Sequence, residues 1–278
     1  MARVFGFIGN QPALTGPLLK THAGPLRVRA TRGSPLGWGL GFYHAGEALL
    51  RRRPVDDREI IDLASVSEQI RTEILLAHIR TPTIGRLRTE NTHPFRYREW
   101  MFAQTGTIAG FSERRARIMA SHPEFLRRNI RGDTDSEVFF FLFLSLLHEA
   151  GHLSDNSASP GDARTALRKT FQLIDELGID GPPQSAGGDL MLSNGDFLIA
   201  AHGDGLMGMH EVTGEHAVSE LFAHDADAPR VSDPASARFT LIAGALDELP
   251  NGWTRVDPGC IVTLTRNGAP GVEAFSSS

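Results

Sequence analysis

The chain has 278 residues, of which 41% are hydrophobic and 22% are charged, and its formal net charge is −5. This length fits one large domain or two small ones with a sizeable core, and the negative balance argues against nucleic acid as a partner. The single cysteine, Cys260, excludes an internal disulfide and a cysteine-rich zinc site.

The first half of the chain predicts short strands with helices between them. Apolar runs bounded by glycine or turn residues are typical of buried strands, and a glycine turn between two such runs predicts a hairpin. We expect strands at Val4–Ile8, Ile74–Ile79 and Glu99–Gln104, a hairpin of Trp38–Tyr43 with Glu47–Arg52, and a helix over Ser112–Ala120.

The middle of the chain predicts two helices. Thr134 and Glu137 have the spacing of a capping box, in which each side chain accepts a hydrogen bond from the other residue's backbone N–H. The helix that follows is apolar nearly all round, so we expect it to be buried between layers. A second helix is expected over Ala163–Leu177, ending at Gly178.

The last third returns to strands. Asn194-Gly195 between two apolar runs is a strong hairpin signal. We expect that hairpin at Met191–Leu192 and Phe197–Ala200, with further strands at Phe239–Ala243 and Ile261–Leu264. Strands, helices and strands again indicate an α+β fold with helices packed on sheet faces. Without a repeat or a composition break, the sequence favours a single domain over residues 1–278.

The sequence also predicts a cytoplasmic protein with no membrane partner. The N-terminus lacks a charged leader followed by an apolar stretch and a small-residue cleavage site. The longest strongly apolar run, Val138–Leu147, is far shorter than the about 20 residues that a membrane span needs.

Several motifs, in order, resemble the class II glutamine amidotransferases, most closely their small stand-alone bacterial members. The resemblance covers nearly the whole chain, and the order and spacing of the motifs make it specific. The matching segments are Val4–Gly9, Gly37-Trp38-Gly39, His78–Thr83, Asn91–Phe95, Gly132–Glu137, Leu192–Gly195 and Trp253–Gly259. The family fold that this implies is a four-layer αββα sandwich of the N-terminal-nucleophile hydrolase type.

The resemblance implies the roles of the site residues. The family hydrolyses glutamine, or a γ-glutamyl amide, to glutamate and ammonia without a cofactor. Its nucleophile is an N-terminal cysteine whose own α-amine is the base. Arg80, helped by Thr83, matches the arginine that holds the substrate α-carboxylate, for which a planar guanidinium is well suited. Asp135 matches the aspartate that binds the α-ammonium group.

Each of these residues also has an ordinary structural interpretation. Arg80 could be a surface arginine at a strand end, and Asp135 could serve only the helix dipole. Gly37-Trp38-Gly39 indicates either a close backbone approach near the site or a buried tryptophan between glycines. We interpret His93-Pro94 as structural, because proline fixes the chain after a strand.

Two positions depart from the family pattern. The residue after Met1 is Ala2, and a methyl group cannot attack an amide. Where the family has asparagine and glycine as oxyanion donors, this chain has Thr105 and Gly106. Gly106 keeps the backbone donor, but a threonine hydroxyl is shorter than an asparagine amide, and Gln104 is expected to point to the opposite face of its strand. The chain as written is therefore expected to be inactive or very weak.

A competing motif is His148-Glu149-Ala150-Gly151-His152, which has the spacing of a zinc metalloprotease. Glycine and a polar loop place it at a helix end, where two histidines are also favoured by the helix dipole. No convincing third zinc ligand follows, and Glu176, His202 and His210 are no more than candidates. The motif also lies at the end of a helix that the amidotransferase resemblance already explains.

Two interpretations of Ala2 stay open. In one, an active enzyme had its cysteine changed to alanine, which leaves the threonine at position 105 unexplained. In the other, the chain has diverged naturally into a non-catalytic amino-acid-binding or regulatory relative, which explains both departures. A pure interaction protein with a vestigial pocket is a third class.

An ammonia-accepting synthase subunit, if there is one, is expected on another chain. Retention of Met1 would bury or displace the α-amine of residue 2 that the family mechanism needs.

Overall fold

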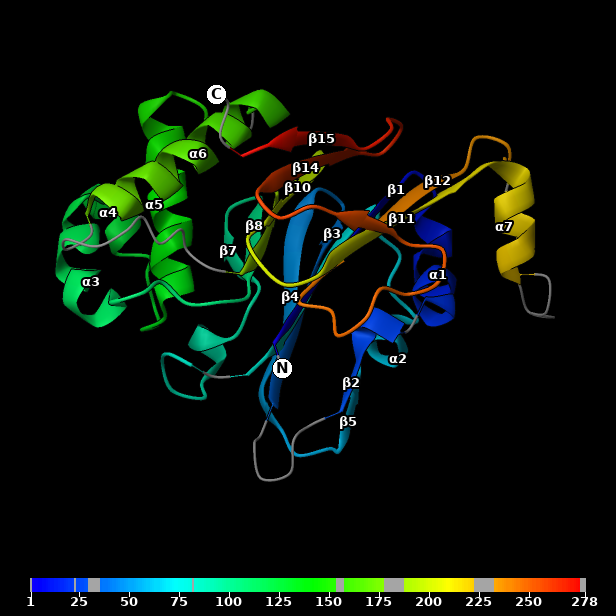
Figure 1. The fold of residues 1–278 in the computed structure, drawn as a ribbon, viewed down its shortest axis with the longest axis horizontal. Coiled ribbons are helices and arrows are strands. Elements are labelled where there is room, and N and C mark those ends of the chain that lie inside the picture. The colour runs from blue at the N-terminus through cyan, green and yellow to red at the C-terminus, as the bar shows by residue number, and fades with distance from the viewer. Residues whose placement is uncertain are drawn as a thin grey trace.

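The computed structural model describes residues 2–22, 24–29, 36–81, 83–153, 158–177, 188–222 and 233–275. Within these residues the chain forms four layers in the order helices, sheet, sheet, helices, which run from left to right in Figure 1. This is the α+β fold with αββα layers that the resemblance implies.

The first sheet is antiparallel, with strand order β13-β11-β12-β1-β6-β3-β4 among the described residues. Strand β1, which follows position 2, lies inside this sheet between β12 and β6. The strands are β1 (Arg3–Gly9), β3 (Leu36–His44), β4 (Glu47–Asp56), β6 (Ile74–Arg80), β11 (Met207–Thr213), β12 (Arg238–Gly244) and β13 (Thr254–Val256).

The second sheet is also antiparallel, with strand order β15-β14-β10-β9-β8-β7 in the same part of the chain. A separate pair joins β2 (Arg27–Arg29) to β5 (Ile60–Asp62). The strands of the second sheet are β7 (Phe95–Tyr97), β8 (Trp100–Gln104), β9 (Asp189–Ser193), β10 (Phe197–His202), β14 (Cys260–Thr265) and β15 (Gly271–Ala274).

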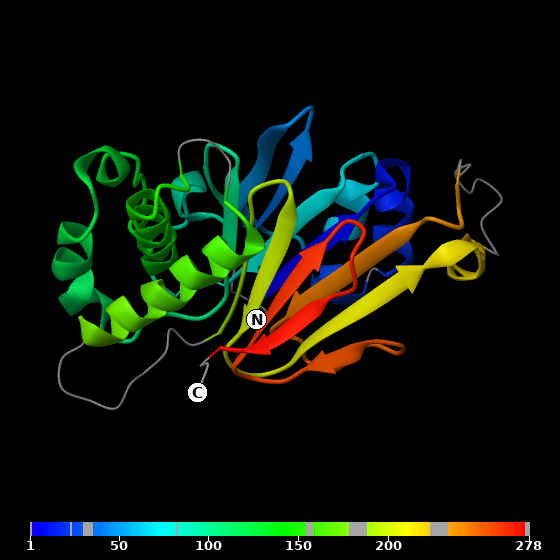
Figure 2. The same cartoon turned by 90° about the horizontal axis from the view of Figure 1, so that it is seen from above.

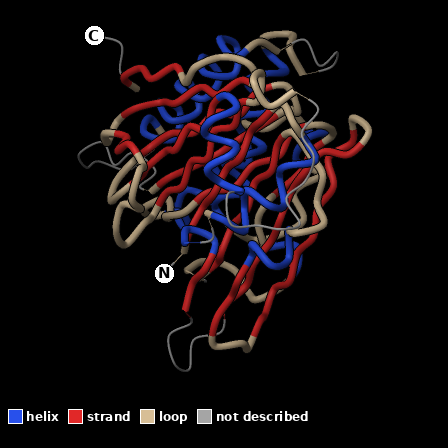
Figure 3. The backbone as a smooth tube through the Cα atoms, turned by 90° about the vertical axis from the view of Figure 1, so that its right-hand side faces the viewer, coloured by secondary structure: helices blue, strands red, loops and turns tan. Residues whose placement is uncertain are grey.

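Helices cover both outer faces, as Figure 2 shows from above. Beside the second sheet lie α3 (Phe111–Ala120), α4 (Glu124–Arg127), α5 (Asp135–Glu149) and α6 (Pro160–Glu176). On the side of the first sheet lie α1 (Thr15–Thr21), α2 (Leu63–Ser67) and α7 (Gly214–Phe222), which face the viewer in Figure 3. Short 3-10 helices span Pro12–Leu14, Gly24–Leu26 and Thr89–Asn91.

The alternation of side chains along β1 explains the layers. Phe5 and Phe7 pack toward α1 and α2, whereas Val4 and Ile8 face the second sheet. Gly6 lies on this inner face, where a Cβ atom would be 2.7 Å from a methyl group of Leu198. The glycine therefore lets the two sheets approach closely.

Helix α5 begins and is buried as expected, but its capping differs from the prediction. The Thr134 hydroxyl accepts the N–H of Glu137 at 3.3 Å. The Glu137 carboxylate does not return to Thr134; it accepts the N–H groups of Arg131 at 2.9 Å and Gly132 at 2.6 Å. The turn before α5 supplies these two N–H donors to Glu137. The predicted hydrogen bond from the Thr134 N–H to the Glu137 side chain is therefore wrong.

Helix α6 begins earlier than expected because Ser159 and Asp162 form the capping box that the prediction overlooked. Gly178, its expected end, lies outside the described residues. All the predicted strands and the helix over 112–120 are confirmed within two residues or extended. Among the helices of the described residues, none combines the length and apolar character needed to cross a bilayer.

Candidate functional site

The six residues that the resemblance assigns to the site lie around one cavity of about 50 Å³. They come from the start of β1, the end of β6, the end of β8 and the start of α5, so both sheets and one helix contribute. The cavity is lined by Ala2, Arg80, Thr83, Thr105, Gly106 and Asp135, together with neighbouring residues.

Position 2 faces the space between the sheets. Arg3 pairs with Ile79 and Val4 pairs with His78, so Ala2 lies level with Arg80 at the end of the two strands. Val4 belongs to the core between the sheets, and a residue two positions away in a strand faces the same side. A side chain at position 2 is therefore directed toward Arg80 and the second sheet, whereas Met1 lies outside the described residues.

Arg80 is buried and holds the loop that follows it. Its Nη2 donates to the carbonyl oxygens of Ile84 at 2.8 Å and Gly85 at 3.2 Å, and its Nη1 donates to that of Arg86 at 3.2 Å. Burial lowers the pKa of the Arg80 guanidinium, and the charges of Asp133 and Asp135 oppose that shift. Arg80 is therefore not the surface arginine of the structural interpretation.

Asp135 is the first residue of α5 and is almost completely buried. Its Oδ2 accepts the N–H of Ile108 at 2.7 Å, yet burial raises the pKa of the Asp135 carboxyl above its ordinary value. Thr83 is exposed at the rim, where its hydroxyl lies 2.9 Å from that of Thr107. The lining of the cavity thus includes two buried residues of opposite ordinary charge, Arg80 and Asp135.

The Thr105 hydroxyl is already engaged by the backbone of Asp189. It accepts the Asp189 N–H at 2.9 Å and donates to the Asp189 carbonyl at 3.3 Å. Gly106 has a φ of 91°, and no described residue accepts a hydrogen bond from its N–H. Of the two positions, only Gly106 has a hydrogen-bond donor that no described residue engages.

Two buried histidines, which the sequence analysis did not assign to the site, also line the cavity. The ring centroids of His78 and His93 are 4.2 Å apart, and neither nitrogen of His93 has a partner among the described residues, whereas His78 interacts with a backbone group of Gln104. Burial lowers the pKa of His78 to about 3 and that of His93 well below its ordinary value. Both imidazoles are therefore neutral near pH 7. Their positions within the two motifs were the available signal.

The other ambiguous positions are also resolved by the fold. A Cβ atom at Gly39 would lie 2.0 Å from the His93 carbonyl oxygen, so this glycine permits a close approach beside the cavity. Trp38 is buried and donates from Nε1 to Asp56 at 2.8 Å, so both interpretations of the Gly-Trp-Gly motif hold. Gln104, which was expected to point to the opposite face of its strand, is also among the residues that line the cavity.

The two histidines of the His-Glu-x-x-His motif have separate partners. Helix α5 ends at Glu149, and Gly151 adopts a φ of 82°, so His152 lies beyond the helix. The His148 ring packs edge-on against Phe125, and His152 pairs with Asp162 at 3.4 Å. The described residues contain no group of three or more metal-ligating side chains that could hold an ion.

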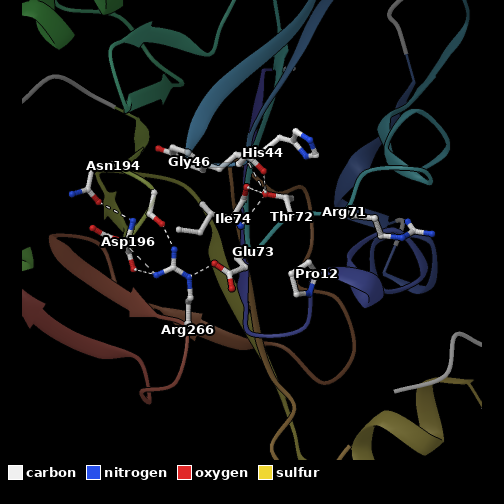
Figure 4. Close-up of a pocket in the computed structure, with 13 residues that line it drawn as sticks. Pro12, His44, Gly46, Arg71, Thr72, Glu73, Ile74, Asn194, Asp196 and Arg266 are labelled. Carbon is white, nitrogen blue, oxygen red and sulfur yellow. Dashed lines mark hydrogen bonds and ion pairs between the residues drawn. The ribbon is translucent and has the colours of Figure 1, made fainter. Parts of the chain in front are cut away.

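A larger cavity, of about 340 Å³, lies at the opposite end of β6 (Figure 4). Arg266 crosses from the second sheet and donates to Glu73 at 2.5 Å and to the Asp196 carbonyl at 3.2 Å. None of the buried side-chain nitrogen or oxygen atoms that lack a partner in the described residues belongs to its lining. Although this cavity is larger, its described lining therefore offers a ligand no buried side-chain nitrogen or oxygen atom that lacks a partner.

Comparisons with known proteins match the whole chain to one family. The family model described as "Glutamine amidotransferases class-II" matches residues 1–277. A probable glutamine amidotransferase of Saccharomyces cerevisiae is 30% identical over 188 residues, which cover 62% of this chain and 52% of that protein. A putative glutamine amidotransferase of Haemophilus influenzae is 26% identical over 252 residues, covering 84% and 74% of the two chains.

A solved structure of a class II domain protein from Silicibacter pomeroyi has the same fold. Its TM-score is 0.58 at 19% identity, and the alignment covers 99% of this chain and 100% of the other. In contrast, the match spans only about half the length of the yeast relative.

Proposed function

Because this chain belongs to the class II glutamine amidotransferase family, whose model matches residues 1–277, we propose that its cavity binds glutamine or a γ-glutamyl amide. As written, with Ala2, it binds this ligand without turning it over. The observation that carries the proposal is the placement of Arg80, Asp135 and position 2 around one cavity.

The amino-acid end of the ligand is recognised by opposite charges. A guanidinium has five N–H donors, and the loop carbonyls engage three of the hydrogen-bonding directions of Arg80. The remaining donors can bind an α-carboxylate, with which charge-assisted bonds are strong. The Asp135 carboxylate supplies the matching site for the α-ammonium group, and Thr83 at the rim adds a hydroxyl.

The amide end of the ligand is suited to the two neutral histidines. A neutral imidazole offers one N–H donor and one acceptor nitrogen, and a carboxamide offers the complementary pair. Both buried ring nitrogens of His93, and one of His78, have no partner among the described residues, which is costly unless a ligand or water supplies one. This supports an uncharged amide group near position 2.

Hydrolysis of that amide needs groups that this chain lacks. In the family reaction the cysteine thiolate attacks the amide carbon, and the developing oxyanion is stabilised by two donors. The methyl side chain of Ala2 has no lone pair with which to form the covalent bond. The Thr105 hydroxyl is engaged by Asp189, which leaves the Gly106 N–H, and loss of one oxyanion donor typically costs about 10²- to 10³-fold in rate.

The proposal accounts for both departures from the family pattern, at positions 2 and 105, when the chain is a non-catalytic amino-acid-binding or regulatory relative. An enzyme altered only at position 2 accounts for Ala2 but not for the engaged Thr105 hydroxyl. If the reaction is restored, the ammonia would pass to water or to a synthase subunit on another chain. Cytoplasmic location is part of the same proposal, since glutamine is a metabolite of that compartment.

Glutamate release from glutamine tests the proposal. The Ala2→Cys variant, with removal of Met1 verified by mass, is compared with the chain as written and with a variant carrying Ala2→Cys and Thr105→Asn. We expect no turnover by the chain as written, slow turnover by Ala2→Cys, and an increase with Thr105→Asn. Calorimetry with the chain as written measures glutamine binding, and failure to bind glutamine or a γ-glutamyl amide would refute the proposal.

A further inference from the structure

A buried aspartate–histidine pair lies between the sheets beside the candidate site. Asp189 begins β9 and His202 ends β10, and the two residues are directly opposite each other. Both face the first sheet, because Met191 and Ala200, two positions along each strand, belong to the core between the sheets. Their side chains are 1% and 0% exposed, so the pair is shielded from solvent.

The Asp189 carboxylate joins the two sheets. Oδ1 accepts hydrogen bonds from His202 Nδ1 at 2.6 Å and from the Gly203 N–H at 3.3 Å. His202 is the last residue of β10 in the second sheet, and Gly203 directly follows it. Oδ2 accepts the N–H of Ala245, which follows β12 of the first sheet, at 2.7 Å. A Cβ atom at Gly244 would lie 2.2 Å from Oδ2, so glycine there permits this contact.

The backbone of the same aspartate holds the oxyanion-side residue. Its carbonyl accepts the Thr105 N–H at 2.7 Å, and its N–H donates to the Thr105 hydroxyl at 2.9 Å. The segment that receives the carboxylate lies beside position 2, because Val4 pairs with Gly244 and Arg3 binds Asp247 at 2.8 Å. Asp189 therefore contacts Thr105 directly and, through Ala245, the segment of the first sheet that lies beside position 2.

The two halves need such a connection because stacked sheets share no backbone ladder between their faces. Position 2 and Arg80 belong to the first sheet, whereas Thr105 and Gly106 follow β8 of the second. We propose that Asp189, oriented by His202, is a positioning residue that sets the distance from position 2 to the oxyanion side. This inference rests on the proposed function.

Tyr43 provides a matched control at the other end of the sandwich. Its hydroxyl, from β3 of the first sheet, donates to the carbonyl oxygens of Glu99 at 2.7 Å and Ser193 at 2.9 Å in the second-sheet region. Tyr43 thus also joins the sheets through buried hydrogen bonds, but it lies in the lining of the larger cavity, away from the candidate site.

The test compares Asp189→Asn, His202→Leu, His202→Asn and Tyr43→Phe in the Ala2→Cys background. An asparagine at 189 has one acceptor oxygen, whereas Asp189 accepts the N–H groups of both Gly203 and Ala245 on different oxygens, so one of these two N–H groups would face the amide N–H group. We expect Asp189→Asn and His202→Leu to lower kcat for glutamine hydrolysis at least about tenfold, since small misplacements at a reacting centre have effects of this size or more. KM should not change, because Arg80 and Asp135 do not contact the pair.

Two further results are expected from the same set. His202→Asn keeps a side-chain N–H near the position of Nδ1 and should restore most of kcat. Tyr43→Phe should lower the melting temperature without lowering kcat. The inference is overturned if kcat is unchanged in Asp189→Asn, if KM and kcat change together, or if Tyr43→Phe lowers kcat equally at the same loss of stability.

A second readout separates this inference from the proposed function. If Ala2→Cys has no turnover, the catalytic part of that proposal has failed, and amide hydrogen exchange is measured on the chain as written. Asp189→Asn should then accelerate exchange at the Thr105 and Ala245 amides, whereas Tyr43→Phe should not. Unchanged exchange at both amides in Asp189→Asn would overturn the positioning role.

Discussion

The linings of the two cavities at the ends of the β-sandwich differ in how their polar groups are paired. At the end of β6 that carries Arg80, the lining includes both ring nitrogens of His93 and the Gln104 Oε1 atom, which are buried without a partner among the described residues. At the other end, Arg266 and Tyr43 bind groups across the gap between the sheets. We call the end with the larger cavity the paired end, because none of the described residues that line this cavity has a buried side-chain nitrogen or oxygen without a partner.

This difference indicates where a ligand is expected. A buried polar atom without a partner costs free energy in every folded molecule, so a fold that retains several of them in one small cavity gains an advantage only when a ligand or water binds there. A cavity whose polar groups are already paired offers a ligand fewer contacts. Partner satisfaction is therefore more informative here than cavity volume.

Of the substitutions predicted here, replacement of Arg80 should have the largest effect, and it should weaken glutamine binding at the smaller cavity. We expect Arg80→Ala to weaken glutamine binding to the chain as written by about 100-fold, because hydrogen bonds to a charged group contribute about 1.5–3 kcal/mol. The glutamine affinity of Arg80→Lys should lie between those of the parent chain and Arg80→Ala, since lysine keeps the charge but not the planar fork. Titration calorimetry measures both.

Arg86→Ala is the control for this prediction, because Arg86 contacts Arg80 through its backbone carbonyl alone. Its glutamine affinity should match that of the parent chain. Equal affinity of Arg80→Ala and the parent would show that the amino-acid end of the ligand lies elsewhere.

Asp135→Asn should weaken glutamine binding less than Arg80→Ala does, and it should increase the stability of the protein. Loss of the carboxylate is expected to weaken glutamine binding by about tenfold, as for one charge-assisted contact. Because burial raises the pKa of Asp135, its ionisation disfavours the folded state. The variant should therefore unfold at a higher temperature than the parent at neutral pH.

The sign of the pH dependence checks the second half of this prediction. Below the ordinary pKa of an aspartate, Asp135 is protonated in both states, so the two proteins should have similar stability there. The advantage of Asp135→Asn should grow as the pH rises through the raised pKa of the folded parent. A variant that is less stable than the parent at every pH would contradict this account.

Glu73→Gln, at the paired end, should have the smallest effect. The Glu73–Arg266 ion pair is partly exposed, with side chains 41% and 28% accessible, and such pairs contribute about 0–1 kcal/mol. We expect a loss of stability in that range, which decreases in high salt, and no change in glutamine binding. Urea denaturation and calorimetry measure the two quantities, and a binding defect would make the larger cavity a second candidate site.

Local signals in the sequence were sufficient for most of the fold. Asn194-Gly195 predicted the β9–β10 hairpin, and Thr134 predicted the start of α5. Short strands such as β2, β5 and β13 were missed because three residues are too few to show a period. The helices α1, α2 and α7 were missed as well, and the first two are short and sit between strands.

The motifs also predicted which residues gather at the site, but not what their side chains contact. Arg80, Thr105 and Asp135 line the same cavity, as the resemblance implies. His93, interpreted as structural, also lines it, and the Thr105 hydroxyl is bound to a residue 84 positions away. These contacts depend on strand neighbours that the sequence order does not reveal.

The sequence by itself determined the elements and the chemistry available at each motif, because turn residues, caps and side-chain alternation act within a few positions along the chain. Only the tertiary structure decided which of those groups are free. The stacking of two sheets brought the Asp189 carboxylate to Ala245 and left the ring of His93 without a partner among the described residues in the cavity. Such pairings depend on the register and separation of distant strands, to which local signals contribute no information.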